Sequence, residues 1–60
     1  MTKDELMDLS LALADKADDS NDAADHDEFH AASDICVLLA MRPHQVTPYV
    51  KRWLVELSKR

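Results

Sequence analysis

The stretch that decides the fold is residues 6–17, Leu6-Met-Asp-Leu-Ser-Leu-Ala-Leu-Ala-Asp-Lys-Ala17. Its apolar residues recur every three or four positions, which is the spacing of one face of an α-helix, and aspartates fall on the opposite face. Just before it, Thr2 and Glu5 have the spacing of a capping box, in which each side chain bonds the backbone N–H of the other. The sequence therefore predicts a helix over 3–19, with an apolar face wide enough to contact two neighbours.

A second helix is predicted over 22–42. The carboxylate of Asp22 or that of Asp25 can cap its N-terminus, and Pro43 ends it, because the residue before a proline avoids helical backbone angles. Between Ile35 and Met41 this helix is apolar on all sides. We therefore expect it to be the central, most buried element, sandwiched between two other helices.

A third helix is predicted over 47–58, with Thr47 as its N-cap and Pro48 in its first turn. The chain contains no glycine, and its two prolines lie close together, a composition that gives little support to β-hairpin turns. We predict an all-α fold of one domain over residues 1–60, consisting of a two-helix hairpin and a C-terminal helix.

Charge is sharply sorted along the chain. Residues 1–34 contain eleven carboxylates and two lysines, a net charge of −9, whereas residues 35–60 contain five basic residues and one glutamate, a net charge of +4. A chain with this pattern can attract a second copy of itself or a partner with the matching pattern. The overall charge of −5 argues against general affinity for nucleic acid.

The short chain and its composition predict self-association, most simply as a homodimer. Sixty residues build only a small core, and the single cysteine, Cys36, permits neither an internal disulfide nor a cysteine-rich zinc site. The predicted interface residues are Leu6, Leu9, Leu13, Ile35, Leu38, Trp53 and Leu57. Phe29, Leu39 and Leu54 join them in the predicted core, and on this assignment Leu38→Asp should abolish folding or assembly.

No catalytic, cofactor or metal site is predicted, and we expect the protein not to be an enzyme. His26 and His30 have the four-residue spacing of metal-binding histidines on a helix. Two solvated histidines in an acidic first turn are the interpretation we favour, and the sequence does not decide whether the pair binds a metal. Cys36 stands among aliphatic residues that would keep its thiol inert. The acidic stretch 15–28 lacks the glycine of a calcium-binding EF-hand loop.

Localisation signals are also lacking. The acidic start of the sequence is unlike a signal peptide, and the seven-residue apolar run 35–41 is far shorter than the roughly 20 residues needed to span a bilayer. We expect a cytoplasmic protein without membrane partners.

Taken whole, the chain resembles the small, acidic, helical accessory proteins encoded in the early regions of lambda-like temperate phages. The resemblance covers all 60 residues and is carried by the opening Met1-Thr-Lys-Asp-Glu-Leu6, the aspartate-rich hinge after the first helix, and the tail from Arg42-Pro-His44 to Trp53-Leu54. It implies a protein of the bacterial host cytoplasm that acts by binding, in the switch between lysis and lysogeny, and it brings no catalytic residues to this sequence.

Two functions follow as hypotheses. The first is a non-enzymatic regulatory or adaptor protein that acts by protein–protein interaction. The second is a dimeric DNA-binding regulator that uses the basic C-terminal helix, in which Arg42, Lys51 and Arg52 would contact phosphates beside aromatic side chains.

Overall fold

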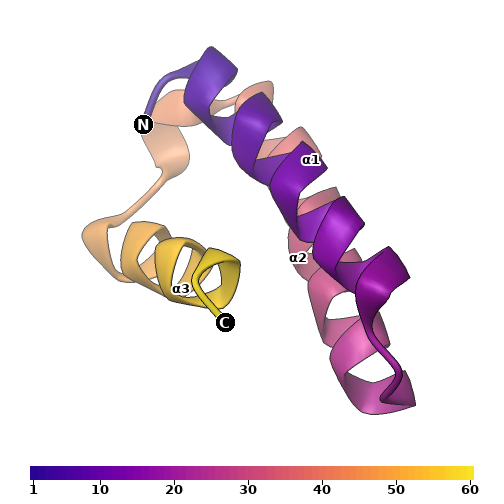
Figure 1. Ribbon diagram of the computed structural model, residues 1–60. Coiled ribbons are helices and arrows are strands. Elements are labelled where there is room, and N and C mark those ends of the chain that lie inside the picture. The colour runs from indigo at the N-terminus through magenta and orange to yellow at the C-terminus, as the bar shows by residue number, and fades with distance from the viewer.

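The computed structural model describes residues 1–60 as three α-helices and one turn of 3-10 helix (Figure 1). Helix α1 spans Lys3–Asp19, α2 spans Ala23–Ala40, the 3-10 turn η1 spans Pro43–Gln45, and α3 spans Pro48–Ser58. These bounds lie within two residues of the predicted ranges, and the predicted all-α fold is confirmed. None of the helices combines the length and the apolar character needed to cross a membrane.

Side-chain caps fix where each α-helix begins. The Thr2 hydroxyl accepts from the backbone N–H of Glu5, and the Thr2 N–H donates to the Glu5 carboxylate, each at 3.2 Å. The bond from the Thr2 backbone N–H to the Glu5 carboxylate is the main cause that holds the pKa of Glu5 below its ordinary value. Asp22 accepts from two backbone N–H groups at the start of α2, and Thr47 accepts from one at the start of α3, directly before Pro48. Thr2 and Thr47 therefore cap the helices predicted for them, and of the two candidates for α2 the cap is Asp22, not Asp25.

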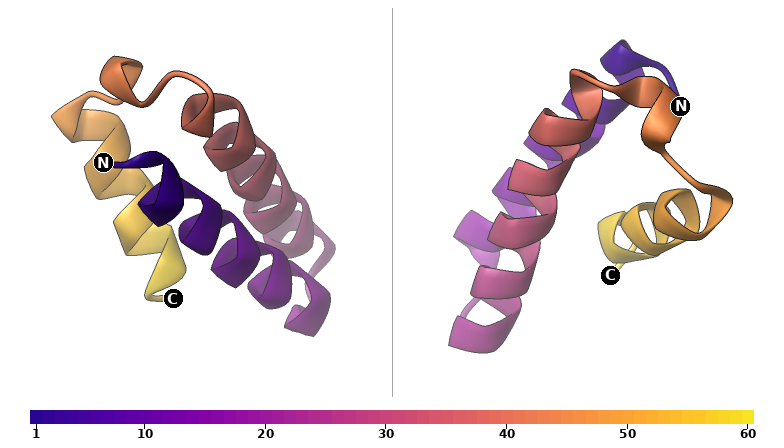
Figure 2. Two further views of the ribbon diagram at one scale, coloured as in Figure 1. Left: turned by 90° about the horizontal axis from the view of Figure 1, so that it is seen from above. Right: turned by 180° about the vertical axis from the view of Figure 1, so that it is seen from behind.

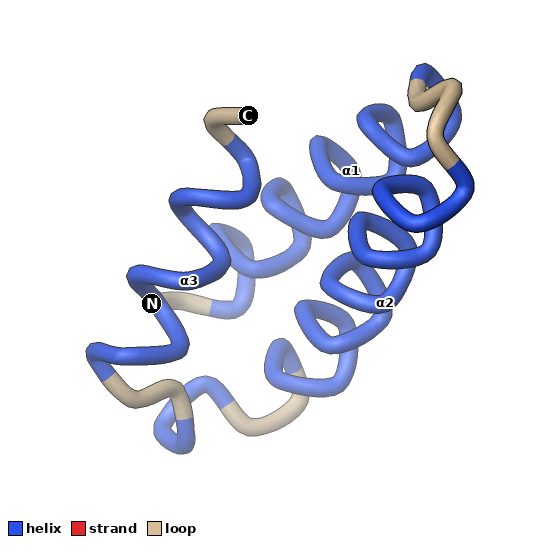
Figure 3. Tube along the Cα trace, turned by 90° about the horizontal axis from the view of Figure 1, so that it is seen from below, coloured by secondary structure: helices blue, strands red, loops and turns tan.

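The helices α1 and α2 form an antiparallel hairpin, and α3 packs across the outside of α1 (Figures 2 and 3). Figure 3 shows α1 between α3 and α2. The expectation that the second helix lies between the other two is wrong. The broad apolar face of α1, which includes Leu6 and Leu9, is the one that contacts both neighbours.

The core lies where the three helices meet. Its buried apolar residues are Leu6, Leu13, Ala17, Phe29, Ala32, Cys36, Ala40, Leu54 and Leu57, with Leu9, Leu39 and Trp53 packed against them. Small residues dominate the contribution of α2, because this helix approaches α1 through Ala32, Cys36 and Ala40. Burial raises the pKa of the Cys36 thiol.

Two predicted core residues lie elsewhere. Leu38 is 66% exposed and Ile35 is only half-buried, so the core assignment of Leu38 is wrong. The reason is that α2 is apolar all round from Ile35 to Met41, whereas α1 covers only one of its faces. The sequence pattern alone did not select which face that is.

A reciprocal pair of serines lies at the centre of the hairpin interface. The Ser10 hydroxyl donates to the carbonyl of Ser33 at 3.1 Å, and the Ser33 hydroxyl donates to the carbonyl of Ser10 at 2.8 Å. Both serines are buried. Their small side chains let the two backbones approach closely, and their bonds set the register of α1 against α2.

Leu38→Asp is expected to leave the fold of the single chain intact, with a change in the free energy of unfolding within about 0.5 kcal/mol, because the site faces solvent. Leu13→Ala is the control for a buried leucine, since Leu13 is fully buried. It should lower the free energy of unfolding by roughly 2–5 kcal/mol. Urea unfolding followed by circular dichroism measures both. A Leu38→Asp chain as unstable as Leu13→Ala would contradict the observed packing of α2.

Ser33→Leu is expected to destabilise the hairpin by about 1–3 kcal/mol, because the larger side chain would force α1 and α2 apart. Ser33→Ala removes one hydrogen bond and keeps the spacing, so it should cost only about 0.5–1.5 kcal/mol. Asp34→Leu, one position along and exposed, should change the unfolding free energy little. Equal urea midpoints for Ser33→Leu and Asp34→Leu would show that close approach at Ser33 is not required.

Candidate functional site

The hairpin has two flanks, and α3 covers only one of them. On this covered flank the Lys16 ammonium donates to the carbonyl of Arg60 at 2.6 Å, and the Arg60 guanidinium donates to Glu28 at 3.1 Å. Leu9 and Val55 line the groove between α1 and α3. Because Leu9 and Lys16 are seven residues apart, they share one stripe of α1, and this stripe faces α3.

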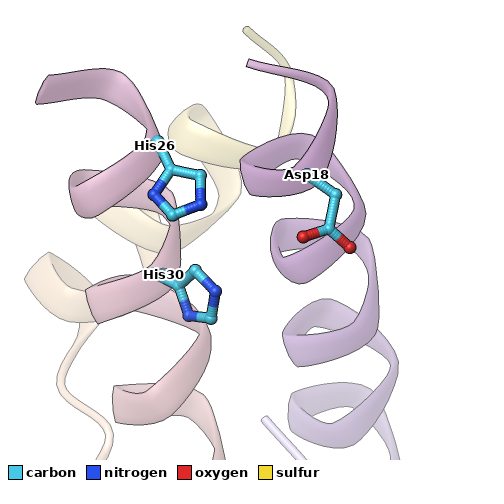
Figure 4. A group of neighbouring side chains, drawn as sticks. All are labelled: Asp18, His26 and His30. Carbon is cyan, nitrogen blue, oxygen red and sulfur yellow. The ribbon is translucent and has the colours of Figure 1, made fainter. Parts of the chain in front are cut away.

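The other flank has no helix over it. Met7, Leu11 and Asp18 share the stripe of α1 that lies on the opposite side from Leu9, as the helical spacing requires. Asp18 lies beside His26 and His30 of α2 (Figure 4), so the α1 stripe borders the edge of α2 that carries the two histidines. Val37 and Met41 continue this edge at the spacing of successive helical turns.

We call this surface the uncovered flank and define it by its large apolar residues Met7, Leu11, Val37 and Met41. All four are exposed, Leu11 at 66% and Met41 at 77%, and Leu38 is exposed beside them. On a chain with only nine buried apolar residues, this is a large amount of aliphatic and thioether surface in water. Apolar surface of this kind on a small protein commonly marks an interaction site.

Carboxylates are concentrated at one end of the hairpin. At the end where the two helices are joined by a turn, residues 15–28 contain seven carboxylates and a single lysine. At the open end, Lys3 continues the stripe of Met7, and Arg42 follows Met41. The turn end is therefore strongly acidic, whereas the open end carries these two cations beside the carboxylate of Asp4, which shares the stripe of Leu11.

The predicted interface residues are divided between the interior and the surface. Leu6, Leu13 and Leu57 are buried within the single chain and belong to its own core. Leu9, Ile35 and Trp53 are partly buried, and Leu38 is exposed. The predicted interface does not include the uncovered flank. The sequence does contain a signal for it, because Met7 and Leu11 widen the apolar stripe of α1 beyond what the hairpin buries.

The three basic residues of the DNA-binding alternative are exposed and come from two parts of the chain. Arg42 lies between α2 and η1, whereas Lys51 and Arg52 lie on adjacent positions of α3. Lys51 is near enough to Glu5 that its positive charge makes a small contribution to lowering the pKa of that carboxylate. The arrangement leaves these cations solvent-accessible and places carboxylates of α1 nearby.

The turn end of the hairpin brings together three metal-ligand side chains. Ligand atoms of Asp18, His26 and His30 all lie within 4.8 Å of one another, and Figure 4 shows both imidazoles on α2 turned toward the carboxylate on α1. The sequence pointed to the two histidines but not to Asp18, because that contact depends on how the hairpin closes. Cys36 is fully buried in the hairpin interface, far along α2 from this cluster.

Comparison of the chain with protein-family models, with curated proteins and with solved structures gives no match.

Proposed function

We propose that the protein acts by protein–protein association, and that the first partner of its uncovered flank is a second copy of the same chain. The observation that carries the proposal is the group of exposed apolar side chains Met7, Leu11, Val37 and Met41 on the one side of the hairpin that α3 leaves bare. Removing such surface from water is the main driving force of association.

Charge complementarity favours a second copy over an unrelated protein. If two uncovered flanks pack antiparallel about a two-fold axis, the acidic turn end of one chain lies beside the open end of the other, with its Lys3 and Arg42. Each chain then makes the same contacts as its partner, as a closed dimer requires. The resulting core would consist of four helices, two from each hairpin, with apolar residues from successive helical turns at its centre.

The same surface supports a role in binding rather than in catalysis. We propose that the dimer is a regulatory or adaptor protein, and its exposed carboxylates in residues 15–28 suit a partner with a basic surface. The resemblance to phage accessory proteins would make the partner a host or phage protein of the lysis–lysogeny decision.

Leu11→Glu is expected to convert the dimer to a monomer, because each copy would bring an uncompensated charge into the apolar contact. Light scattering after gel filtration should give twice the 6.8 kDa mass of one chain for the wild type and the single mass for Leu11→Glu. Tyr49→Glu is the matched control, because Tyr49 is 80% exposed but lies on α3, and it should remain dimeric. Circular dichroism checks that all three are equally helical.

Two results would contradict the proposal: a wild-type chain that stays monomeric at high concentration, or a Leu11→Glu chain that stays dimeric. Retention of duplex DNA that falls steeply with salt and is lost in a Lys51→Ala, Arg52→Ala chain would favour the DNA-binding alternative instead.

A further inference from the structure

The cluster of Asp18, His26 and His30 offers two different ligand types from two different helices. Asp18 belongs to the last turn of α1, and the histidines stand one turn apart on α2, so that both imidazoles project from the same side of that helix. Their ligand atoms are within 4.8 Å of one another. Atoms bound to one zinc ion at about 2.0–2.2 Å lie somewhat closer together than this, and partly or fully exposed side chains can close the difference by rotation.

The backbone that holds the three ligands is fixed independently of any ion. The turn between α1 and α2 is closed by Ser20, whose hydroxyl donates to the carbonyl of Asp22 and accepts from its N–H, at 3.2 and 3.3 Å. The Asp22 carboxylate then caps α2 through two backbone N–H groups. The end of α1 and the start of α2 are therefore held next to each other, so binding an ion needs side-chain movement only.

A neighbouring carboxylate can orient one of the imidazoles. Nδ1 of His26 lies 3.4 Å from the Asp27 carboxylate. When Nδ1 carries the proton and donates to Asp27, Nε2 keeps the lone pair that a metal requires. Carboxylates placed in this way behind a metal-binding histidine fix its tautomer and raise its basicity. The other aspartates of residues 15–28 add a negative field that attracts a cation.

We propose that Asp18, His26 and His30 bind one divalent transition-metal ion of the zinc type. Two imidazoles and one carboxylate are a donor set that suits zinc, and three protein ligands leave a fourth position for water or for a ligand from a partner. The bound ion would join the end of α1 to the start of α2. The site shares the turn end of the uncovered flank but none of its apolar residues, so it does not depend on dimer formation.

Zinc is expected to bind the wild-type chain at one ion per chain in a calorimetric titration. It should raise the melting temperature by roughly 10 °C when free zinc exceeds Kd about 100-fold, because it binds the folded hairpin and not the separated helices. His30→Ala and Asp18→Asn should each weaken binding by at least the roughly 10- to 100-fold that follows loss of an outer-shell partner. Adding a chelator should return the wild-type melting temperature to its metal-free value.

The chain provides matched controls for both ligand types. His44 is the third histidine and lies in η1, and Asp19 is the exposed neighbour of Asp18, so His44→Ala and Asp19→Asn should bind zinc like the wild type. The Leu11→Glu chain should also bind zinc normally, which separates this site from the proposed dimer surface. A melting temperature unaffected by zinc, or equal loss of binding in His44→Ala and His30→Ala, would overturn the proposal.

Discussion

The close approach of α1 to α2 is the constraint on which the rest of the structure depends. The interface is lined by Ser10, Ala17, Ala32, Ser33, Cys36 and Ala40, whose small side chains bring the two backbones together. The large residues that these two helices bury are Leu6, Leu13 and Phe29. The hydroxyls of Ser10 and Ser33 bond each other's backbone carbonyls, and no buried side-chain polar atom in the chain lacks a partner. The register of α1 against α2 that these contacts set determines which side chains face α3 and which face solvent.

A tightly closed hairpin has two flanks, and a chain of this length has one further helix with which to cover them. Helix α3 is short and strongly amphipathic, and it buries Leu54 and Leu57 against the covered flank, where Arg60 bonds both Lys16 and Glu28. No helix among residues 1–60 covers the other flank. The large apolar side chains of that flank therefore stay exposed in the single chain, and it is this surface that the proposed second copy would cover.

Local signals in the sequence predicted the helices well. Thr2, Asp22 and Thr47 each define a helix start through a bond to a backbone N–H a few residues away, and such short-range bonds can be read from spacing alone. The faces of α2 could not be read in this way. From Ile35 to Met41 every face is apolar. The choice of Cys36 over Leu38 for the interior depends on how Ala32 and Ser33, one turn earlier, pack against α1, which only the folded hairpin reveals. The proximity of Asp18 to His26 and His30 could not be predicted from local spacing either, because these residues belong to two different helices.

The burial of Cys36 gives this chain a built-in reporter of its own opening. The chain has a single thiol, which lies fully buried between α1 and α2, and its raised pKa disfavours the reactive thiolate. A thiol reagent can therefore modify the protein only during the moments when the two helices part. The rate of that modification reports how often the two helices separate, without any engineered label in the chain, and anything that holds the helices together must slow it.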